Sequence, residues 1–368
     1  MFSKKKVIRY GFIINLPFLI LLALSCLSGK LNPTIWWPIA LSGLAFPMLL
    51  IIAVVSGIIW LFIKPKFSLF CLIAIIISIP NILVTFPIQF TNDNEAENST
   101  SLRILTWNVK LLNYSAPDTE TAISENGKIF SKLRQVNADV ICLQEFFTAV
   151  IPDKTYNFID SIRNSLDYPY FYFSRDYPKF DEKFFSGTLI LSKYKIIDSN
   201  KFDFPNSIPG SIIKASIQFH NDTIDIVSSR FLHISFGSGD NTALKNGYKT
   251  QGKLPQSISR LKHVYADKVS QVKKLQEVLD NCKHPSIFAG DLNDVPTSYV
   301  YNNVKRNMKD VWLQKGMGAG PTFKFITNTL RIDFIFSDRS FDVKKTNRII
   351  SSASDHYGVF SDLLLKKD

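Results

Sequence analysis

The chain has 368 residues, a formal net charge of +12 at pH 7 and four cysteines. This length predicts two structural units rather than one average domain, and the four scattered cysteines exclude a disulfide framework and a CxxC metal pair. Residues 1–90 hold seven Lys and Arg and no Asp or Glu, so about +5 remains on residues 91–368, and the basic balance argues only weakly for nucleic acid.

Three apolar stretches follow one another near the N-terminus, at about residues 7–27, 36–63 and 67–90. Each is close to the ~20 residues that a helix needs to cross a bilayer, and Trp36-Trp37 stands where aromatic residues line a membrane interface. A cleaved signal peptide is the alternative for the first stretch, but its apolar part would be too long and two more stretches follow. We therefore predict a membrane anchor of three transmembrane helices in residues 1–90.

The positive charges predict how this anchor is oriented. Lys and Arg precede the first stretch and lie between the second and third, whereas only Lys30 lies on the opposite side. The positive-inside rule then places the N-terminus in the cytoplasm and everything after about residue 91 outside it. Residues 91–100 are polar and are predicted to be a linker. A re-entrant segment in place of one of the three spans is the alternative, because four prolines lie in these stretches: Pro17, Pro47, Pro80 and Pro87.

From residue 101 onward, short β-branched and aromatic runs alternate with turn signals. A helix is predicted over residues 125–135, and apolar spacings of three and four predict a second over residues 258–282. Residues 235–256 lack periodicity, and they are either a basic loop with a functional role or an unstructured insertion. This order of elements predicts an α/β sandwich. The predicted strands are Leu102–Trp107, Asp139–Leu143, Gly187–Leu191, Ile212–Phe219, Thr223–Val227, Pro285–Ala289 and Ile332–Ser337.

Five polar clusters stand at the ends of these apolar runs or inside them. Each alone is ordinary turn or edge chemistry, except that a carboxylate inside the apolar run Ile332–Ser337 needs a partner. Together they bring four carboxylates, two amides and one histidine to wherever the strand ends converge, an oxygen-rich set that suits Mg²⁺ or Mn²⁺ better than zinc. A hard metal beside a histidine fits phosphoester chemistry. The clusters are centred on Asn108, Glu145, Asp291 with Asn293, Asp333, and Asp355 with His356.

The order TWN, LQE, SGTLILSKY, GDLND, RIDFIF and SDH resembles the endonuclease/exonuclease/phosphatase superfamily over about residues 102–366. Its members include deoxyribonucleases, abasic-site endonucleases, inositol polyphosphate phosphatases and bacterial sphingomyelinases. The preceding apolar stretches make the chain similar to membrane-anchored bacterial members. The resemblance implies a four-layer α/β sandwich for residues 101–368, with two packed mixed β-sheets flanked by helices. With the orientation given by the positive-inside rule, a bacterial member would lie in the inner membrane with its catalytic domain periplasmic or extracellular.

The resemblance also implies a role for each polar residue. Glu145 would be the principal metal ligand, with Asn108 in the metal and phosphate shell and Asp355 as a further metal-side carboxylate. Asp291 would orient or deprotonate the attacking water, Asn293 would contact the scissile phosphate, and His356, held by Asp333, would bind or protonate the phosphate.

The run Val227–His233 departs from the family pattern, in which an Asn–X–His–Leu element is common. Ser228 stands in place of the asparagine and Arg230 in place of the histidine. Arg230 can bind a phosphate but cannot transfer a proton near neutral pH. Strand alternation predicts that His233 points to the opposite face from Arg230 unless the chain bulges. Three tyrosines are candidates for a phosphate contact, with core packing as the alternative for at least two: Tyr170, Tyr172 and Tyr177.

These residues predict a membrane-anchored, Mg²⁺-dependent phosphoesterase, with Mn²⁺ as a substitute metal. Nucleic acid is the favoured substrate because the segment 245–263 is basic, and the lipid bilayer is the expected partner of the N-terminal helices. A phospholipid, sphingolipid or inositol-phosphate phosphoesterase is the alternative enzyme. A non-catalytic phosphate-binding module, or a decayed and inactive copy, is the alternative of another class. The sequence indicates no protein partner.

Overall fold

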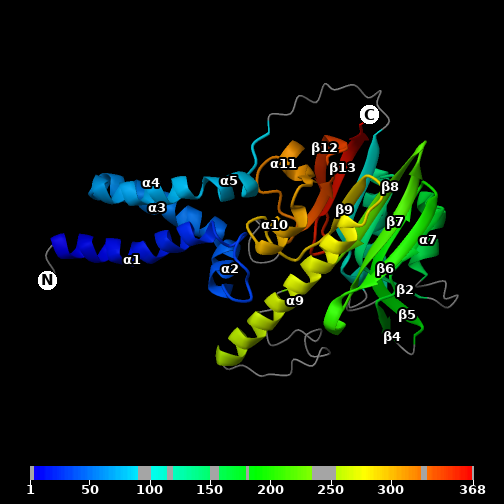
Figure 1. The fold of residues 1–368 in the computed structure, drawn as a ribbon, viewed down its shortest axis with the longest axis horizontal. Helices are drawn as coiled ribbons and strands as arrows, with labels where there is room; N and C mark the ends of the chain where they lie inside the picture. The colour runs from blue at the N-terminus through cyan, green and yellow to red at the C-terminus, as the bar shows by residue number, and fades with distance from the viewer. Residues whose placement is uncertain are drawn as a thin grey trace.

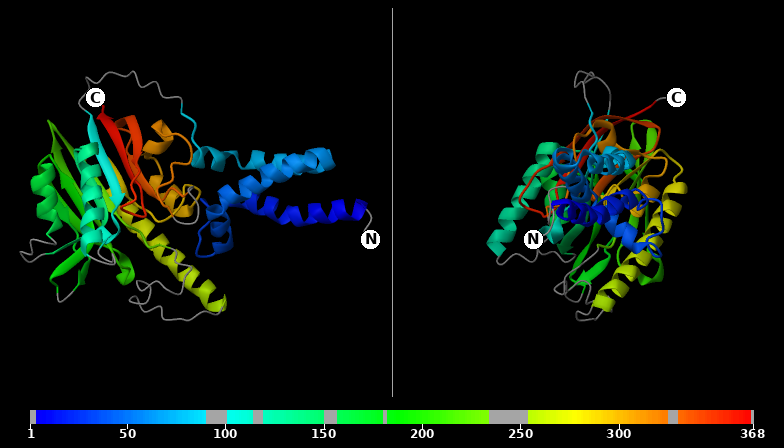
Figure 2. Two further views of the ribbon diagram at one scale, coloured as in Figure 1. Left: turned by 180° about the vertical axis from the view of Figure 1, so that it is seen from behind. Right: turned by 90° about the vertical axis from the view of Figure 1, so that its left-hand side faces the viewer.

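The computed structural model describes residues 4–89, 101–113, 119–149, 157–179, 182–233, 254–324 and 330–366. A helical N-terminal bundle projects from a body built on two β-sheets (Figure 1). The N-terminus and the turn between α3 and α4 lie at the end of the bundle that is remote from the sheets (Figures 1 and 2). The bundle consists of α1 Lys4–Ser25, α2 Trp37–Leu44, α3 Phe46–Ile63, α4 Pro65–Ile77 and α5 Ile79–Thr85.

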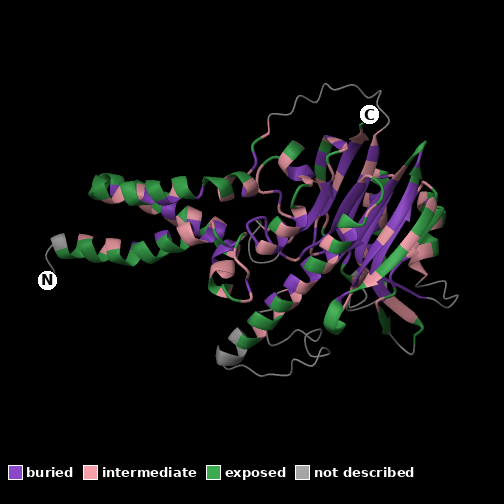
Figure 3. Cartoon of the chain, in the orientation of Figure 1, coloured by how far each residue is buried: buried purple, intermediate pink, exposed green. Residues whose placement is uncertain are grey.

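Two helical segments of the bundle, Lys6–Ser25 and Phe46–Ile63, are long and apolar enough to cross a membrane. The stretch expected at 36–63 is broken at Ala45 into α2 and α3, because Pro47 cannot continue the helical hydrogen-bond ladder. The stretch expected at 67–90 is bent by 57° between α4 and α5, so it is either a broken third span or a re-entrant loop. Many residues along the outside of the bundle are exposed (Figure 3), and they include large apolar residues such as Ile14, Ile58 and Phe62, which indicates association with a membrane.

The body contains two mixed sheets. The first has the strand order β12-β13-β1-β2-β5-β3, with β4 also paired to β5, and the second has the order β10-β11-β9-β8-β7-β6. The first sheet is formed by β1 Leu102–Asn108, β2 Val140–Ala149, β3 Tyr170–Phe173, β4 Tyr177–Lys179, β5 Phe184–Ser192, β12 Phe341–Ile349 and β13 Gly358–Leu365. The second is formed by β6 Ile196–Asp203, β7 Ser211–Phe219, β8 Asp222–Ser229, β9 Ser286–Asp291, β10 Lys309–Asp310 and β11 Asp333–Ser337.

Helices cover the outer face of each sheet, which completes four layers and confirms the predicted sandwich. One buried cluster, which includes Ile104 and Ile226, lies between the sheets. A second lies between the first sheet and its helices, and a third packs the second sheet against α9 and α10. The helices of the body are α6 Thr119–Val136, α7 Phe158–Leu166, α9 Leu254–Asp280, α10 Tyr299–Lys305 and α11 Val311–Lys315, with short 3₁₀ turns η1 Lys110–Asn113 and η2 Pro205–Ser207.

Strand direction decides where the polar clusters meet. β1 and β2 are parallel, as are β8 and β9, so their carboxyl ends share one edge of each sheet. β13 runs antiparallel to β1 and β11 antiparallel to β9, so the beginnings of β13 and β11 lie at that same edge. The packed sheets therefore gather strand ends and strand beginnings from distant parts of the sequence at one end of the sandwich.

Candidate active site

The predicted polar residues come together at this end of the sandwich. Asn108 closes β1 and Asp291 closes β9. Asp333 opens β11 directly opposite Asp291, and Arg230 follows β8 and forms a parallel bridge with Asp291. His356 lies two residues before β13. Residues from both sheets thus face one shared site.

Asn108 links the two sheets through its side-chain amide. Its Nδ2 donates to Glu145 Oε1 at 3.1 Å in its own sheet and to Asp291 Oδ2 at 3.0 Å in the other. Its Oδ1 accepts from the backbone N–H of Lys110 at 3.1 Å. Because Asn108 is 1% exposed and each of these bonds fixes the amide plane, Asn108 sets the separation of the two carboxylates.

Glu145 is in a β-bulge, not at the end of its strand as the sequence indicated, because β2 continues to Ala149. The pairing with β5 shifts register between Leu143 and Phe146, and Glu145 has a positive φ of 50°. The bulge turns the carboxylate into the site. Burial raises the pKa of the Glu145 carboxyl, but the Arg230 guanidinium and the Asn108 donor outweigh burial and lower it.

Asp291 is fully buried and accepts hydrogen bonds on both carboxylate oxygens. Asn293 donates to it twice, from its backbone N–H at 2.8 Å and from Nδ2 at 3.0 Å. Burial and the neighbouring Asp333 carboxylate raise the pKa of Asp291 from 3.8 to about 6. Asp291 is therefore a carboxylate that can accept a proton close to neutral pH.

Asn293 has a positive φ of 48°, a conformation that asparagine tolerates better than most residues. Its Nδ2 donates to the carbonyl of Phe231 at 2.8 Å as well as to Asp291, which fixes the turn. Lys268 holds the turn from the other side, because its Nζ donates to the carbonyl of Asn293 at 2.6 Å and pairs with Asp294 at 3.1 Å.

Lys268 is fully buried, and the sequence reasoning missed it. It occupies the buried stripe of α9 between Tyr265 and Val272, where the spacing calls for an apolar side chain. A lysine inside such a stripe is the signal that could have revealed it, because a buried ammonium group needs a partner.

His356 and Asp333 form a buried pair. His356 Nδ1 lies 2.9 Å from Asp333 Oδ2. Burial lowers the pKa of the imidazole, but the charge and hydrogen bond of Asp333 more than offset burial and raise it from 6.5 to about 9. Trp107 Nε1 donates to the carbonyl of His356 at 3.0 Å, and Ser354 Oγ accepts from the His356 backbone N–H at 3.1 Å. The ring is held as an imidazolium, with Nε2 as the nitrogen that Asp333 does not engage.

Asp355 lies at the rim of the site, with 40% of its side chain exposed. Its carboxylate is 3.7 Å from Lys110 Nζ, and its charge helps to raise the pKa values of Arg230 and His356. Asp355 and Glu145 are therefore carboxylates of the site that solvent reaches.

Arg230 is the cationic residue between the two sheets. Its guanidinium NH2 is 2.7 Å from Glu145 Oε1 and its Nε is 3.9 Å from Asp291 Oδ2. The charge of His233 also lowers the pKa of Glu145, so His233 lies near the same carboxylate. β8 ends at Ser229, and the predicted alternation of faces therefore does not extend to His233.

Of the three candidate tyrosines, Tyr177 lies nearest to Arg230. The Tyr177 hydroxyl and the Arg230 carbonyl both flank Gly210. Burial raises the pKa of Tyr177 to about 12, and the charges of Arg230 and Glu145 also act on it. Tyr172 packs against the core between the sheets, and Tyr170 is exposed on the edge strand β3.

If Arg230 binds the substrate phosphate, as its place in the sequence predicts, Arg230→Gln is expected to raise KM for a phosphodiester by about tenfold or more while the fold is retained. The change also removes the cation that lowers the pKa of Glu145. Steady-state kinetics of the full-length protein measure this effect, with Arg134→Gln on the exposed face of α6 as the matched control. A KM equal to that of the parent would show that Arg230 only pairs with Glu145.

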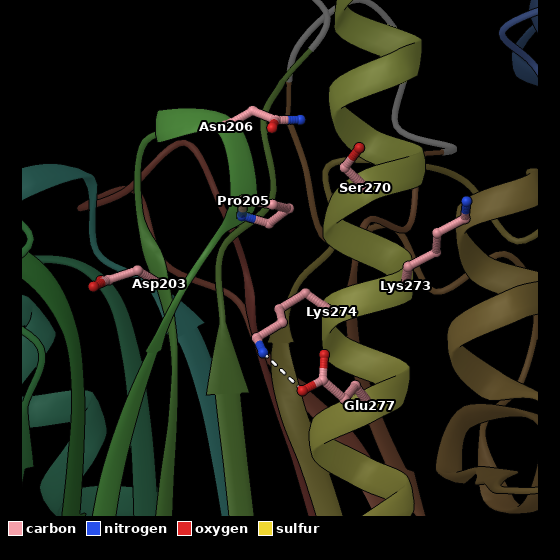
Figure 4. A pocket seen from close by; sticks show the side chains of 7 residues that line it. All are labelled: Asp203, Pro205, Asn206, Ser270, Lys273, Lys274 and Glu277. Carbon is pink, nitrogen blue, oxygen red and sulfur yellow. Dashed lines mark hydrogen bonds and ion pairs between the residues drawn. The ribbon is translucent and has the colours of Figure 1, made fainter.

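A surface groove of about 460 Å³ lies between η2, which follows the end of β6, and α9 (Figure 4). Lys274 and Glu277 on its wall pair with each other at 2.9 Å. None of the polar residues of the strand-end site lines this groove, so we do not assign the groove to the candidate active site. It is lined by Asp203, Pro205, Asn206, Ser270, Lys273, Lys274 and Glu277.

A family model described as "Endonuclease/Exonuclease/phosphatase family" matches residues 105–356. The chain belongs to this family. Members of the family are phosphoester hydrolases that generally depend on a divalent metal. A second family model, a domain of unknown function (DUF8431), matches residues 5–85. No curated protein matches the sequence.

Solved structures of the family share the fold. An endonuclease/exonuclease/phosphatase from Beutenbergia cavernae is 22% identical, with a TM-score of 0.52 over 72% of each chain. The human nocturnin catalytic domain with bound sulfate is 15% identical, with a TM-score of 0.52 over 72% of this chain and 94% of that one. A family protein from Bacteroides vulgatus is 19% identical, with a TM-score of 0.51 over 73% of this chain and all of that one. At these identities the likeness concerns the fold alone.

Proposed function

We propose that the chain is a membrane-anchored, Mg²⁺-dependent phosphodiesterase in which residues 101–368 are catalytic and residues 1–90 are the anchor. The observation that carries the proposal is that one buried site holds both a carboxylate placed to accept a proton and an imidazolium placed to donate one. Asp291 is oriented by Asn108 and Asn293, and its pKa is raised to about 6, whereas His356 is paired with Asp333, and its pKa is raised to about 9. Environments that push two pKa values apart assign the base and the acid.

The residues at the mouth of the site fit a hard divalent cation. Glu145 and Asp355 are ionisable oxygen donors with 23% and 40% of their side chains exposed, and Asn108 contacts Glu145 directly. We assign the metal to these three residues rather than to the trio Asp291, Asp333 and His356, because His356 Nδ1 is already bonded to Asp333. When bound, Mg²⁺ or Mn²⁺ would polarise the phosphoryl oxygen and stabilise the leaving oxygen.

The remaining roles follow from the hydrogen bonds. Asp291, aligned by Asn108 and Asn293, orients the attacking water and accepts its proton. His356, held by Asp333, binds or protonates a phosphate oxygen through Nε2. Arg230 contributes a permanent positive charge to the phosphate. Asn293 would contact the scissile phosphate when its Nδ2 exchanges the bond to the Phe231 carbonyl or to Asp291 for a phosphate oxygen.

Nucleic acid outside the cytoplasm is the substrate that we propose. The basic segment 245–263 includes Lys262 and His263, which are exposed on α9. A basic surface of this kind suits the phosphate backbone of a nucleic acid. The turn at Lys64–Lys66 lies at the end of the bundle remote from the body (Figure 1), which supports the orientation that the positive charges indicate. In a bacterial inner membrane the catalytic domain would then face the periplasm or the outside.

Sealed membrane vesicles that carry the full-length protein test these statements together. Right-side-out vesicles are expected to cleave added DNA or RNA with Mg²⁺ and to stop with EDTA, whereas inverted vesicles become active only after detergent. Bis(4-nitrophenyl) phosphate and sphingomyelin serve as parallel substrates.

Each departure has a separate meaning. Activity of intact inverted vesicles would reverse the orientation, and activity in EDTA would remove the metal. Cleavage of sphingomyelin but not of nucleic acid would change the substrate class. Permeabilised vesicles that cleave none of these substrates would refute the phosphodiesterase.

A further inference from the structure

The helical bundle contacts the body through buried hydrogen bonds. Ser28 Oγ, in the turn after α1, donates to the carbonyl of Thr297 at 2.7 Å. Thr297 Oγ1 donates in return to the carbonyl of Gly43 in α2 at 2.9 Å. Ser28, Gly43 and Thr297 are all buried. The turn after α1 and the end of α2 are thus both joined to Thr297, two residues before α10.

A second contact joins α5 to the segment before β11. Arg331 NH2 donates to the carbonyl of Val84 at 3.3 Å, in the last turn of α5. Arg331 is 1% exposed, and its NH1 is held by Asp310 at 2.7 Å. Val84 also packs against the core between the second sheet and its helices. The end of α5 is therefore fixed to a buried cation.

Both contacts lie within a few residues of the active site. Thr297 is four residues after Asn293, a reach of at most about 14 Å for an extended chain. Arg331 is two residues before Asp333. Lys268 binds the beginning of the segment between Asp291 and Thr297, through the carbonyl of Asn293 and the carboxylate of Asp294. The segment Asp291–Thr297 is thus held by α9 at one end and by the bundle at the other.

Inside the bundle, α2 packs so closely on the turn after α1 that no room is left for a side chain at Gly43. A Cβ there would lie 2.4 Å from Ser28 Oγ and 2.7 Å from Ser28 Cβ. The same turn packs directly on the body, because a Cβ at Gly29 would lie 2.2 Å from Asn302 Nδ2 in α10 and 3.3 Å from the carbonyl oxygen of Thr297. A displacement of Ser28 would therefore also move Thr297, to which it is hydrogen-bonded.

We propose that the N-terminal bundle is a positioning element of the active site. Through Thr297 and Arg331 it fixes the two segments that carry Asp291 with Asn293 and Asp333. This proposal rests on the catalytic roles proposed above for those residues. The bundle then does more than hold the enzyme at a bilayer, because catalysis depends on its being docked.

Gly43→Ala in the full-length protein, in detergent micelles, tests this proposal. The new methyl group meets Ser28 and displaces Thr297, so kcat for bis(4-nitrophenyl) phosphate is expected to fall by about tenfold or more, since small displacements of reacting groups are costly. KM is expected to change less than kcat, because Arg230, which follows β8, lies on neither displaced segment. Amide hydrogen exchange should rise in residues 292–302 and 330–333 but not in β1 or β5.

Two further variants distinguish positioning from general damage. Gly11→Ala is the control, because its Cβ would contact only the Trp60 ring, at 3.3 Å, within the bundle. Ser28→Ala removes the hydrogen bond to Thr297 without adding a clash, so it should lower kcat and raise exchange in residues 292–302 in the same direction as Gly43→Ala.

Parent values of kcat and of exchange in Gly43→Ala would overturn the proposal. A loss of kcat matched by the Gly11→Ala control would overturn it too. If the parent cleaves no phosphodiester, the proposed function fails, and exchange at 292–302 and 330–333 still decides whether the bundle orders these segments.

Discussion

Asp291→Asn is expected to lower kcat by about 10²–10⁴-fold, the range that a positioned proton acceptor contributes. The substitution keeps the size of the side chain and removes the basic oxygen. Both oxygens of Asp291 now accept hydrogen bonds, and its pKa is raised to about 6, so the carboxylate is aligned and holds a proton only weakly at pH 7.

The measurement is single-turnover hydrolysis of a phosphodiester by the full-length protein with saturating Mg²⁺. Asp222→Asn at the exposed start of β8 is the control, because it makes the same chemical change far from the strand ends. Retention of more than about a tenth of the parent kcat in Asp291→Asn would show that another group accepts the proton, because a general base contributes at least about 10²-fold.

His356→Gln is expected to lower kcat by a similar factor, about 10²–10⁴-fold, because it removes the protonated ring that we propose binds or protonates the phosphate. In the parent, kcat/KM should rise as pH increases through about 6, where Asp291 loses its proton, and fall above about 9, where His356 loses its own. The variant should lose the alkaline limb and keep the acidic one. An alkaline limb that survives in His356→Gln would assign it to a different group.

The same histidine links stability to pH. Its pKa is raised in the folded protein above the usual 6.5, so folding favours the protonated form. The stabilising contribution of the Asp333–His356 pair is complete below about pH 6.5 and is lost as pH rises through about 9. The difference in thermal stability between parent and His356→Gln should therefore shrink over that interval. A constant difference would mean that the pair is uncharged.

Apolar strands made most of the fold predictable from the sequence. The runs at 102–107, 212–219 and 332–337 are rich in β-branched and aromatic residues, and each is a strand in the structure. β6 and β12 were not predicted, because polar and charged residues interrupt the apolar residues throughout their sequences, IIDSNKFD and FDVKKTNRI. Edge position allows such sequences to be strands.

The site was predictable where a polar residue interrupts an apolar run. Asp333 was identified because a carboxylate among apolar residues needs a partner, and His356 is that partner. Glu145 was identified by type but not by its place, since a bulge depends on the pairing with β5. Lys268 and Thr297 escaped notice because their importance arises from contacts with segments distant in the sequence.

The bond between Thr297 and Gly43 joins residues 254 positions apart, and the bond between Ser28 and Thr297 joins residues 269 apart. During synthesis, the N-terminal helices therefore leave the ribosome long before their binding partner does. Contacts of such separation close late in folding, because the loop between them must be ordered first. We expect the turn that carries Asp291 and Asn293 to reach its final shape last, after the helices have entered their membrane. The chain would then become an active hydrolase only once it has arrived where it is to act.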